Sequence, residues 1–497
     1  MTSATTERTT APLLGPAESR IVWLLLAAAF VAILNETTMG VAIPHLIVDL
    51  GITAISAQWL TTAFMLTMAV VIPISGFLLR RFTTRQVFIA AMSFFSLGTL
   101  IALLAPGFEV LLVARVVQAM GTAIMMPLLM TTLMTIVPAA SRGRMMGRVS
   151  IVMSLAPAIG PTLSGILLEF GWRWIFAVVL PIALLSLAVG ARWIRNLGET
   201  THAPIDILSV VLSAFGFGGI VYGLSQIGGA AAHGGTEAEL AAQSMSSLSL
   251  VISFVTGGVA LALFLWRQVM LQRTDDALLD LRVFGDRNFS LAIGQMALLS
   301  LAFFGTITVL PLYMQRGLEY SALETGLAVL PGSLLMGLAG PFIGRIYDAR
   351  GTRVLLVPGA IIAVSVLWLF ALTFTDTTPL WFIIGAQTIL SLGLALSFTP
   401  LFTASLGSLH PRFYSYGSAV LGTVQQVAGA AGIAVMITVM ASVSAGAAEA
   451  GATATAAESQ GAHAAFLLAA IVSLPLLIGA FLIRKPADNT IAAPISH

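Results

Sequence analysis

Two charged residues lie well inside long apolar stretches of this sequence. Glu36 lies in AILNETTMGVAIPHL (32–46) and Arg115 lies in the apolar stretch 109–133, whereas the other acidic residues fall in loops or near the ends of such stretches. Burial in an apolar medium favours the neutral form of a carboxylic acid, and a nearby arginine favours its charged form. A carboxylate placed between these two influences can take up and release a proton near neutral pH.

The depths of these two residues in a membrane can be compared. With about 1.5 Å of rise per residue, Glu36 and Arg115 both lie roughly 9 Å below the same membrane surface if each stretch is a spanning helix. They could therefore meet, directly or through Gln118. The alternative is a static ion pair that only fixes helix packing. We favour proton binding, because an ionisable group inside a membrane is costly and usually functional.

The elements that must position these residues are membrane-spanning helices. The chain has 497 residues, of which 58% are hydrophobic and only 9% are charged, against about a quarter charged in soluble proteins. A helix needs about 20 apolar residues to cross the hydrocarbon core. We predict an all-α membrane protein with fourteen such helices, at 21–43, 57–79, 86–105, 109–133, 147–169, 174–195, 205–227, 248–270, 289–313, 325–345, 354–374, 379–406, 417–441 and 464–484.

The basic residues lie almost entirely on one side of the predicted membrane. Of the 23 lysines and arginines, only Arg173 and Arg316 fall in loops on the other side, and Arg115 falls inside a span. Because basic residues are enriched in cytoplasmic loops, we expect both termini to lie in the cytoplasm.

A repeated motif indicates that the chain consists of two related halves. SGFLLRRFTTRQV (75–87) follows the second span and IGRIYDARGTRVL (343–355) follows the tenth. With two spans set aside, this is a parallel six-plus-six duplication, and transporters of this kind bind substrates between the halves. The predicted parts are a cytoplasmic tail at 1–20, a six-helix half at 21–200, two inserted helices at 201–272, a cytoplasmic amphipathic linker at 273–288, a second half at 289–484 and a cytoplasmic tail at 485–497.

Three segments outside the spans have their own patterns. The linker mixes charge with Leu, Val and Phe, so we expect a short amphipathic helix along the membrane surface. The segments 228–247 and 441–462 have low complexity and are rich in Ala, Gly and Ser. We expect them to be flexible or partly helical connections.

The stretch APAIGPTLSG (156–165) combines two prolines with small residues at helical spacing. Ala156, Gly160 and Ser164 would form a face that another helix can approach closely. Gly and Pro are also frequent in membrane helices generally. We expect a hinge at the boundary between the halves, formed by Pro157, Gly160, Pro161 and Gly165.

Other residues of the same spans could contact a ligand. Methionine side chains are adaptable, and aromatic rings can stack on cations. Taken singly, each such residue is more often a packing residue. The expected substrate cavity contains Asn35, Trp59, Gln118, Met125, Met126 and Phe304.

The sequence lacks the motifs of several other classes of membrane protein. It has no cysteine, and its single lysine, Lys485, precedes Pro486, so neither a thiolate site nor a nucleotide-binding Gly-Lys-Ser/Thr loop is present. No HExxH motif occurs, and the six histidines are scattered. We therefore expect a protein that is not an enzyme, needs no metal or cofactor and does not use ATP as its direct source of energy.

Read together, these stretches resemble the signatures of the fourteen-spanner drug:proton antiporters of the major facilitator superfamily, in particular the bacterial lincomycin-resistance type. LNETTMGVAIPHL resembles the helix 1 signature, AQWLTTAFML (57–66) that of helix 2, RVVQAMGTAIMMP (115–127) the Arg-x-x-Gln-x-x-Gly pattern of helix 4, APAIGPTLSG the antiporter motif of helix 5, and GRIYDARGTR (344–353) the gating loop. The resemblance implies gating residues at Gly76, Arg81, Arg85, Gly344, Asp348 and Arg353.

This sequence departs from the family pattern at three positions. Arg80 stands where the first gating loop usually has Asp, and Thr83 stands where it usually has Gly. A charge-relay lock is therefore not expected in the N-terminal half. Asn35 stands where helix 1 usually has its acid, one residue before Glu36. A shift of one residue turns a side chain by about 100° around a helix.

The expected function is proton-coupled export of apolar, cationic or zwitterionic drugs by alternating access, in which Glu36 carries the proton and Arg115 tunes it. The resemblance implies a multi-pass protein of the bacterial cytoplasmic membrane that acts on small lipophilic compounds, works as a monomer and binds no nucleic acid. Two alternatives stay open: a dedicated exporter of one metabolite, antibiotic or lipid, and a non-transporting membrane sensor.

Overall fold

The computed structural model describes residues 15–486 apart from 197–199, 201–203 and 231–236, and these described residues form helices joined by short loops. The helices are α1 (Pro16–Leu50), α2 (Ala54–Arg81), α3 (Thr84–Leu104), α4 (Phe108–Ile136), α5 (Arg142–Leu168), α6 (Arg173–Trp193), α7 (Ile207–Ala230), α8 (Glu237–Leu271), α9 (Arg287–Leu312), α10 (Ala322–Arg350), α11 (Arg353–Thr373), α12 (Leu380–Ser408), α13 (Tyr414–Glu449), α14 (Ala454–Ser473) and α15 (Pro475–Leu482). Shorter helical turns are η1 (Ala139–Ser141), η2 (Leu281–Gly285), η3 (Tyr313–Gly317) and η4 (Pro411–Phe413).

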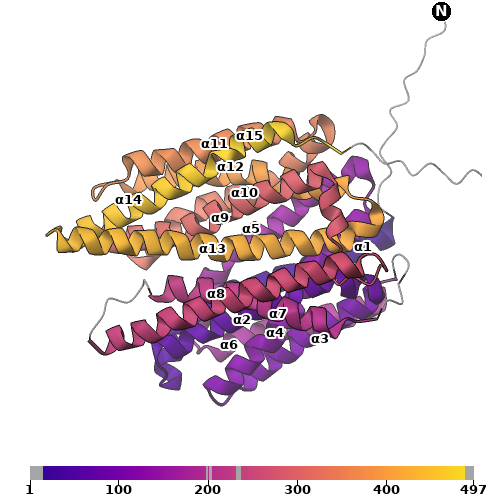
Figure 1. Ribbon diagram of the computed structural model, residues 1–497, viewed down its shortest axis with the longest axis horizontal. Helices are drawn as coiled ribbons and strands as arrows, with labels where there is room; N and C mark the ends of the chain where they lie inside the picture. The colour runs from indigo at the N-terminus through magenta and orange to yellow at the C-terminus, as the bar shows by residue number, and fades with distance from the viewer. Residues whose placement is uncertain (1–14, 197–199, 201–203, 231–236, 487–497) are drawn as a thin grey trace, which may run out of the picture.

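The described part of the chain contains fourteen spans that are long and apolar enough to cross a membrane, which confirms the predicted fold class. The last span consists of α14 and α15 together, with a break before Pro475. Because the number of spans is even, α1 begins and α15 ends at the same end of the bundle (Figure 1). We call this end the terminal end.

Side chains at the loop–helix junctions set where several helices begin. Thr83 Oγ1 accepts a hydrogen bond from the backbone N–H of Gln86 (3.3 Å), and Gln86 Oε1 accepts one from the N–H of Thr83 (3.1 Å). Ser321 and Glu324 form the same reciprocal cap at the start of α10. Thr83, one of the departures from the resembled gating loop, therefore serves as the cap of α3.

The two halves pack their helices in the same pattern. In the N-terminal half α1 contacts α4, α5 and α6, and α3 contacts α4 and α6. In the C-terminal half α9 contacts α12, α13 and α14, and α11 contacts α12 and α14. Figure 1 shows the first set in indigo to purple and the second in salmon to yellow, on opposite sides of the molecule. Helices α9 to α14 thus repeat the arrangement of α1 to α6, as a parallel duplication requires.

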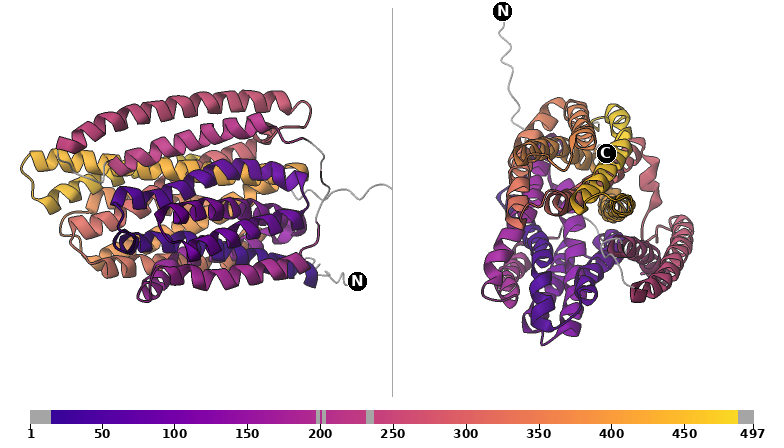
Figure 2. Two further views of the ribbon diagram at one scale, coloured as in Figure 1. Left: turned by 90° about the horizontal axis from the view of Figure 1, so that it is seen from below. Right: turned by 90° about the vertical axis from the view of Figure 1, so that its left-hand side faces the viewer.

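Two helix pairs form the most extensive contacts between the halves. Helix α5 packs against α10, and α2 packs against α13, so that the second helix of each half contacts the fifth helix of the other. We call these contacts the α5–α10 seam and the α2–α13 seam. The inserted helices α7 and α8 pack on each other, and α7 covers the outside of the α2–α13 seam (Figure 2).

The linker before α9 is not the amphipathic membrane-surface helix that its composition suggested. It contains only the 3-10 turn η2, and Leu278, Leu279 and Val283 are buried against the protein, whereas Phe284 is exposed. The N–H of Leu279 donates to Gln268 Oε1 (3.0 Å), and the Tyr416 hydroxyl donates to the carbonyl of Ala277 (2.9 Å). The prediction was wrong because the leucines of this segment find apolar partners inside the molecule and do not need the membrane.

The low-complexity segment 441–462 is mostly helical, since α13 extends to Glu449 and α14 begins at Ala454. Its high alanine content favours helix. Of the other such segment, 228–247, residues 231–236 lie outside the described residues, and α8 begins at Glu237.

Candidate functional site

Glu36 lies near the middle of α1, which continues past its predicted end at residue 43 and through Pro44 to Leu50. Its side chain is partly buried. Within the described residues its carboxylate makes no hydrogen bond and no ion pair. Arg115 interacts with it electrostatically, without the close contact of an ion pair. Glu36 is therefore a carboxylate inside the bundle that can accept a proton without first breaking a hydrogen bond.

Arg115 makes its close contacts with residues other than Glu36. Its side chain is fully buried, and Nη1 donates to Gln118 Oε1 (3.0 Å) while Nε donates to the carbonyl of Leu60 (3.4 Å). The guanidinium also lies 4.1 Å from the centre of the Phe64 ring. Gln118 Nε2 in turn donates to Thr99 Oγ1 (3.0 Å). Arg115 thus joins α4 to α2 and α3, and the buried charge is stabilised by hydrogen bonds and by an aromatic face.

Asn35 is buried beside Glu36 and is not satisfied. It is 1% exposed, and neither its amide nitrogen nor its amide oxygen has a hydrogen-bond partner in the described structure. An unpaired buried polar group costs about 1–3 kcal/mol and usually has an explanation in function or in a bound molecule. Asn35 and Glu36 are therefore two adjacent polar residues near the middle of α1 whose side chains make no hydrogen bond in the described structure.

The residues after Glu36 contact the small face of α5. Ser164 Oγ donates to the carbonyl of Thr38 (2.9 Å), and a Cβ atom added at Gly160 would collide with the side chain of Thr37. Ala156 and Gly160 are buried on the same face. This face therefore packs against α1 within the N-terminal half, and the expectation that Gly160 lies at the boundary between the halves is wrong.

The regular spacing of small residues predicted that a helix would approach this face of α5 closely, but it did not predict which helix. Pro157 is partly buried, and Pro161 and Gly165 are exposed. Helix α5 runs without interruption from Arg142 to Leu168, through both prolines. The antiporter-motif segment is therefore a continuous helix in this conformation.

The first turns of α5, which lie far from Gly160 along the helix, pack against α10. A Cβ atom at Gly143 would lie 2.6 Å from the carbonyl oxygen of Gly344, and one at Gly147 would lie 2.7 Å from the carbonyl carbon of Gly340. Asp348 Oδ1 accepts a hydrogen bond from the N–H of Gly143 (2.7 Å). These contacts bring the gating residues Gly344 and Asp348 onto the first turns of α5.

The sequence analysis missed Gly143 and Gly147, although a signal was present. GRMMG (143–147) and GPFIG (340–344) both have the Gly-x-x-x-Gly spacing that lets two helices approach closely. GRMMG lies between Arg142 and Arg148, close to a predicted loop, and such a charged segment does not by itself indicate close packing of two helices.

The α2–α13 seam uses different chemistry. Gly76 packs against Ala419 and the backbone of Ser415. Arg80 donates to the hydroxyl of Tyr416 (3.0 Å), and its guanidinium lies 5.1 Å from the centre of that ring. Arg80, which replaces the usual Asp of the resembled gating loop, thus joins the two halves through an aromatic hydroxyl.

The remaining gating residues lie apart from these contacts. Arg81 has a buried nitrogen, Nη1, without a hydrogen-bond partner in the described structure, and Arg85 is exposed. Arg353 lies at the start of α11, where it lines a surface pocket. Among these three, none contributes a described contact to the α5–α10 seam.

The aromatic and methionine residues expected to line a cavity lie in several environments. Met125 is buried in the apolar core, and Met126 packs against that core. Phe304 packs on Phe303, with ring centres 5.1 Å apart, within the C-terminal half. The Trp59 ring lies 5.8 Å from that of Tyr222 on inserted helix α7.

The described residues contain no group of three or more His, Cys, Asp or Glu side chains that could hold a metal ion. The site consists of the partly buried carboxylate of Glu36, the amide of Asn35, which has no hydrogen bond in the described structure, and Arg115, which is hydrogen-bonded to other residues. It lies next to α5, the helix that also packs against the C-terminal half. A site of this kind can exchange a proton and can respond to movement of α5.

Comparison with known proteins agrees with this architecture. Residues 25–433 match the family model of the Major Facilitator Superfamily. The chain is 42% identical to an uncharacterized MFS-type transporter, YcnB, of Bacillus subtilis, over 94% of this chain and 95% of the relative. It is 39% identical to the lincomycin resistance protein LmrB of the same organism, over 93% of this chain and 95% of that one.

A solved structure has the same fold at low sequence identity. The human organic anion transporter MFSD10 superposes with a TM-score of 0.65 at 14% identity, covering 94% of this chain and all of the other. The chain therefore belongs to the Major Facilitator Superfamily, a family of transporters and not of enzymes, and is a multi-pass protein of the bacterial plasma membrane.

Proposed function

We propose that this transporter exports apolar, cationic or zwitterionic compounds in exchange for protons, by alternating access, and that it does so as a monomer. The similarity to a lincomycin resistance protein supports drug efflux. Proton coupling is supported by the carboxylate of Glu36, which is partly buried in the bundle and makes no hydrogen bond or ion pair within the described residues. This carboxylate is the observation that carries the proposal.

Helix α5 connects the carboxylate to the boundary between the halves. Thr37 and Thr38, which follow Glu36, contact the later part of α5 at Gly160 and Ser164. The first turns of the same helix form the α5–α10 seam. A proton that changes the packing of α1 on α5 therefore changes the relative stability of the closed and open seam, which is the differential binding that coupling requires.

The present conformation is closed at the terminal end. Besides the contacts of Asp348, Ser150 Oγ lies 2.7 Å from Thr399 Oγ1, and Thr131 Oγ1 lies 2.7 Å from Ser418 Oγ, across the two halves. The distribution of arginines predicts that this end faces the cytoplasm. In the proposed cycle this state takes up a proton at Glu36 from outside, and the proton leaves when the terminal end opens.

Transport by Glu36→Gln in inside-out membrane vesicles tests the proposal. With the vesicle interior acidified, wild-type protein should accumulate a fluorescent lipophilic cation and release protons, and Glu36→Gln should do neither. Glu109→Gln, which removes an exposed carboxylate from the first turn of α4, is the matched control and should transport normally. Undiminished gradient-driven uptake by Glu36→Gln would overturn the proton role.

The breadth of substrates is tested in the same vesicles. Competition among chemically unrelated cations supports drug export. Transport of a single compound, with no competition from the others, would instead identify a dedicated exporter of one molecule.

A further inference from the structure

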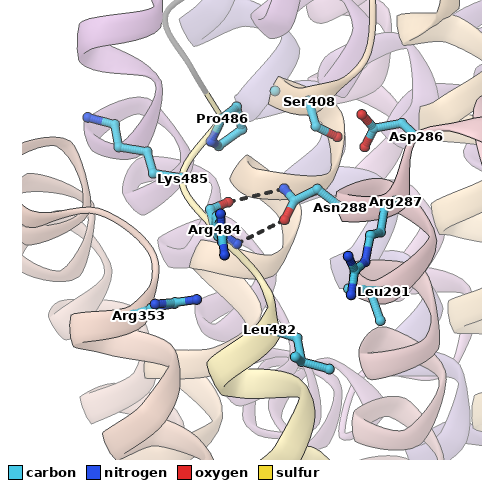
Figure 3. A pocket seen from close by; sticks show the side chains of 11 residues that line it. Asp286, Arg287, Asn288, Leu291, Arg353, Ser408, Leu482, Arg484, Lys485 and Pro486 are labelled. Atoms are coloured by element: carbon cyan, nitrogen blue, oxygen red, sulfur yellow. Dashed lines mark hydrogen bonds between the residues drawn. The ribbon is translucent and has the colours of Figure 1, made fainter.

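A pocket of about 420 Å³ opens at the terminal end of the C-terminal half, away from Glu36. It lies between the first turns of α9 and α11, the end of α12 and the segment that follows α15 (Figure 3). The side chains around it come mainly from Asp286, Arg287, Asn288, Arg353, Arg484 and Lys485.

The pocket holds an excess of positive charge that has no partner in the protein. The side chains of Arg287, Arg353 and Arg484 make no hydrogen bond and no ion pair within the described structure. Figure 3 shows Arg353 and Arg287 on opposite sides of the pocket with Arg484 between them. Asp286 also lines the pocket, and its Oδ1 accepts a hydrogen bond from the N–H of Phe289 (2.7 Å) at the start of α9; four basic residues outnumber this one carboxylate.

The wall of the pocket is held in place by the backbone after α15. Asn288 Oδ1 accepts a hydrogen bond from the N–H of Arg484 (2.9 Å), and Asn288 Nδ2 donates to the carbonyl of the same residue (3.1 Å). Lys485 Nζ donates to the carbonyl of Asp348 (3.0 Å). The backbone at Arg484, which forms one wall of the pocket, is therefore held in place by the fold before any ligand binds.

The position of the pocket indicates what it binds. Helices α9 and α11 begin here and α15 ends here, so the pocket lies where spanning helices leave the membrane. Leu291 and Leu482 form part of its wall, and the adjoining face of α15 exposes Ile478 and Phe481. A ligand that fits has an anionic head for the arginines and an apolar part for this face. Guanidinium groups bind phosphate through paired hydrogen bonds.

We propose that this pocket binds the phosphate headgroup of an anionic phospholipid, whose acyl chains lie along α15 and α9. Basic pockets between spanning helices on the cytoplasmic side are suited to such headgroups. The bound lipid also stabilises the segment that holds the end of α10 through Lys485, next to the seam residue Asp348. This inference is independent of proton coupling and of the exported compound.

Lipid binding to the purified full-length protein tests the proposal. In neutral detergent, phosphatidylglycerol should raise the Tm by roughly 3 °C or more at saturation, and phosphatidylcholine should not. Native mass spectrometry should show the anionic lipid retained on the protein. The double variant Arg287→Gln/Arg353→Gln should weaken the apparent affinity by roughly tenfold or more, because charge-assisted hydrogen bonds are lost.

The control variant is Arg192→Gln/Arg195→Gln, which removes two exposed arginines at the terminal end of the other half. It should bind phosphatidylglycerol like the wild type, and both double variants should unfold at the wild-type temperature in phosphatidylcholine. An equal loss of affinity in both double variants would overturn the proposal, since it would show that general surface charge is responsible. Equal saturation by inorganic phosphate or glycerol 3-phosphate would also overturn it in favour of a site for a soluble anion.

Discussion

Asp348 Oδ1 accepts a hydrogen bond of 2.7 Å from the backbone N–H of Gly143, across the boundary between the two halves. Asp348 Oδ2 accepts a second one of 2.9 Å from the N–H of Arg144, whose exposed guanidinium lies 3.4 Å from the same oxygen. The first N–H groups of a helix lack partners within the helix and carry partial positive charge. A carboxylate of the C-terminal half thus caps a helix of the N-terminal half and holds the terminal end closed.

Asp348→Asn should let the terminal end open more often. Hydrogen bonds to charged groups contribute about 1.5–3 kcal/mol, so the open population should rise roughly tenfold. Because the chain has no cysteine, a Ser150→Cys variant can report on the seam through its rate of labelling by a maleimide in lipid nanodiscs. We expect faster labelling in the presence of Asp348→Asn.

The control for this experiment is Glu324→Gln at the opposite end of the same helix. Its carboxylate accepts hydrogen bonds only from Ser321 in the described structure, within the first turn of α10. It should leave the labelling rate unchanged. If Asp348→Asn labels no faster than this control, the cap does not hold the seam.

Gly147→Ala should also open the seam, by a steric route. The new methyl group would lie 2.7 Å from the carbonyl carbon of Gly340, so the two helices must move apart. Overpacking of this kind costs about 1–3 kcal/mol. We expect slower transport and faster labelling at Ser150→Cys. Gly165→Ala on the same helix, where an added Cβ meets nothing within 4 Å, should behave like the wild type. Equal behaviour of the two variants would show that the close approach is not required.

Arg115→Gln should destabilise the N-terminal half. The change removes the donor to Gln118 Oε1 and takes the cation from the face of Phe64. Each unsatisfied buried group costs about 1–3 kcal/mol. A lower midpoint of thermal unfolding in detergent is expected, with Arg85→Gln, an exposed arginine, as the control. Arg115→Lys should also lower the midpoint, because an ammonium cannot reproduce the forked contacts. Unchanged unfolding of Arg115→Gln would show that the network carries no stability.

The spans could be predicted from the sequence because each depends on its own composition. The fourteen apolar stretches correspond to fourteen spans in the described part of the chain, and the repeated Gly-led loops predicted the duplication that α9 to α14 display. Helix α1 continues beyond the predicted span 21–43 to Leu50, because a proline such as Pro44 can be accommodated in a membrane helix.

The partners of each face could not be predicted, because a pattern on one helix does not identify its neighbour. The small residues at Gly160 predicted close packing, but the neighbour is α1 and not a helix of the other half. The depths of Glu36 and Arg115 allow the two residues to meet, directly or through Gln118, but do not decide whether they do. In the structure Arg115 instead donates its hydrogen bonds to Leu60 and Gln118, and contacts between helices cannot be read from the depth of a residue along its own helix.

The inserted helices carry an ion pair whose contribution should depend on pH. Arg267 on α8 donates to both carboxylate oxygens of Asp206, just before α7, at 2.6 and 2.8 Å. The hydrogen bond from Arg267, together with those from Ser209, lowers the pKa of Asp206 to about 2. An unfolded aspartate has a pKa of about 4, so the stabilisation is fully present above that pH and is lost as the pH falls towards 2.

Asp206→Asn should therefore lower the midpoint of thermal unfolding at pH 7, by an amount equivalent to about 1–2 kcal/mol after screening by solvent. The difference between wild type and variant should narrow between about pH 5 and pH 2, because the wild-type carboxylate becomes neutral there. This difference is measured by thermal unfolding in detergent at a series of pH values. The control is Asp376→Asn, which alters an exposed aspartate and should not reproduce the effect of Asp206→Asn. A difference that stays constant with pH would mean that Asp206 stabilises the α7–α8 pair by its shape and not by its charge.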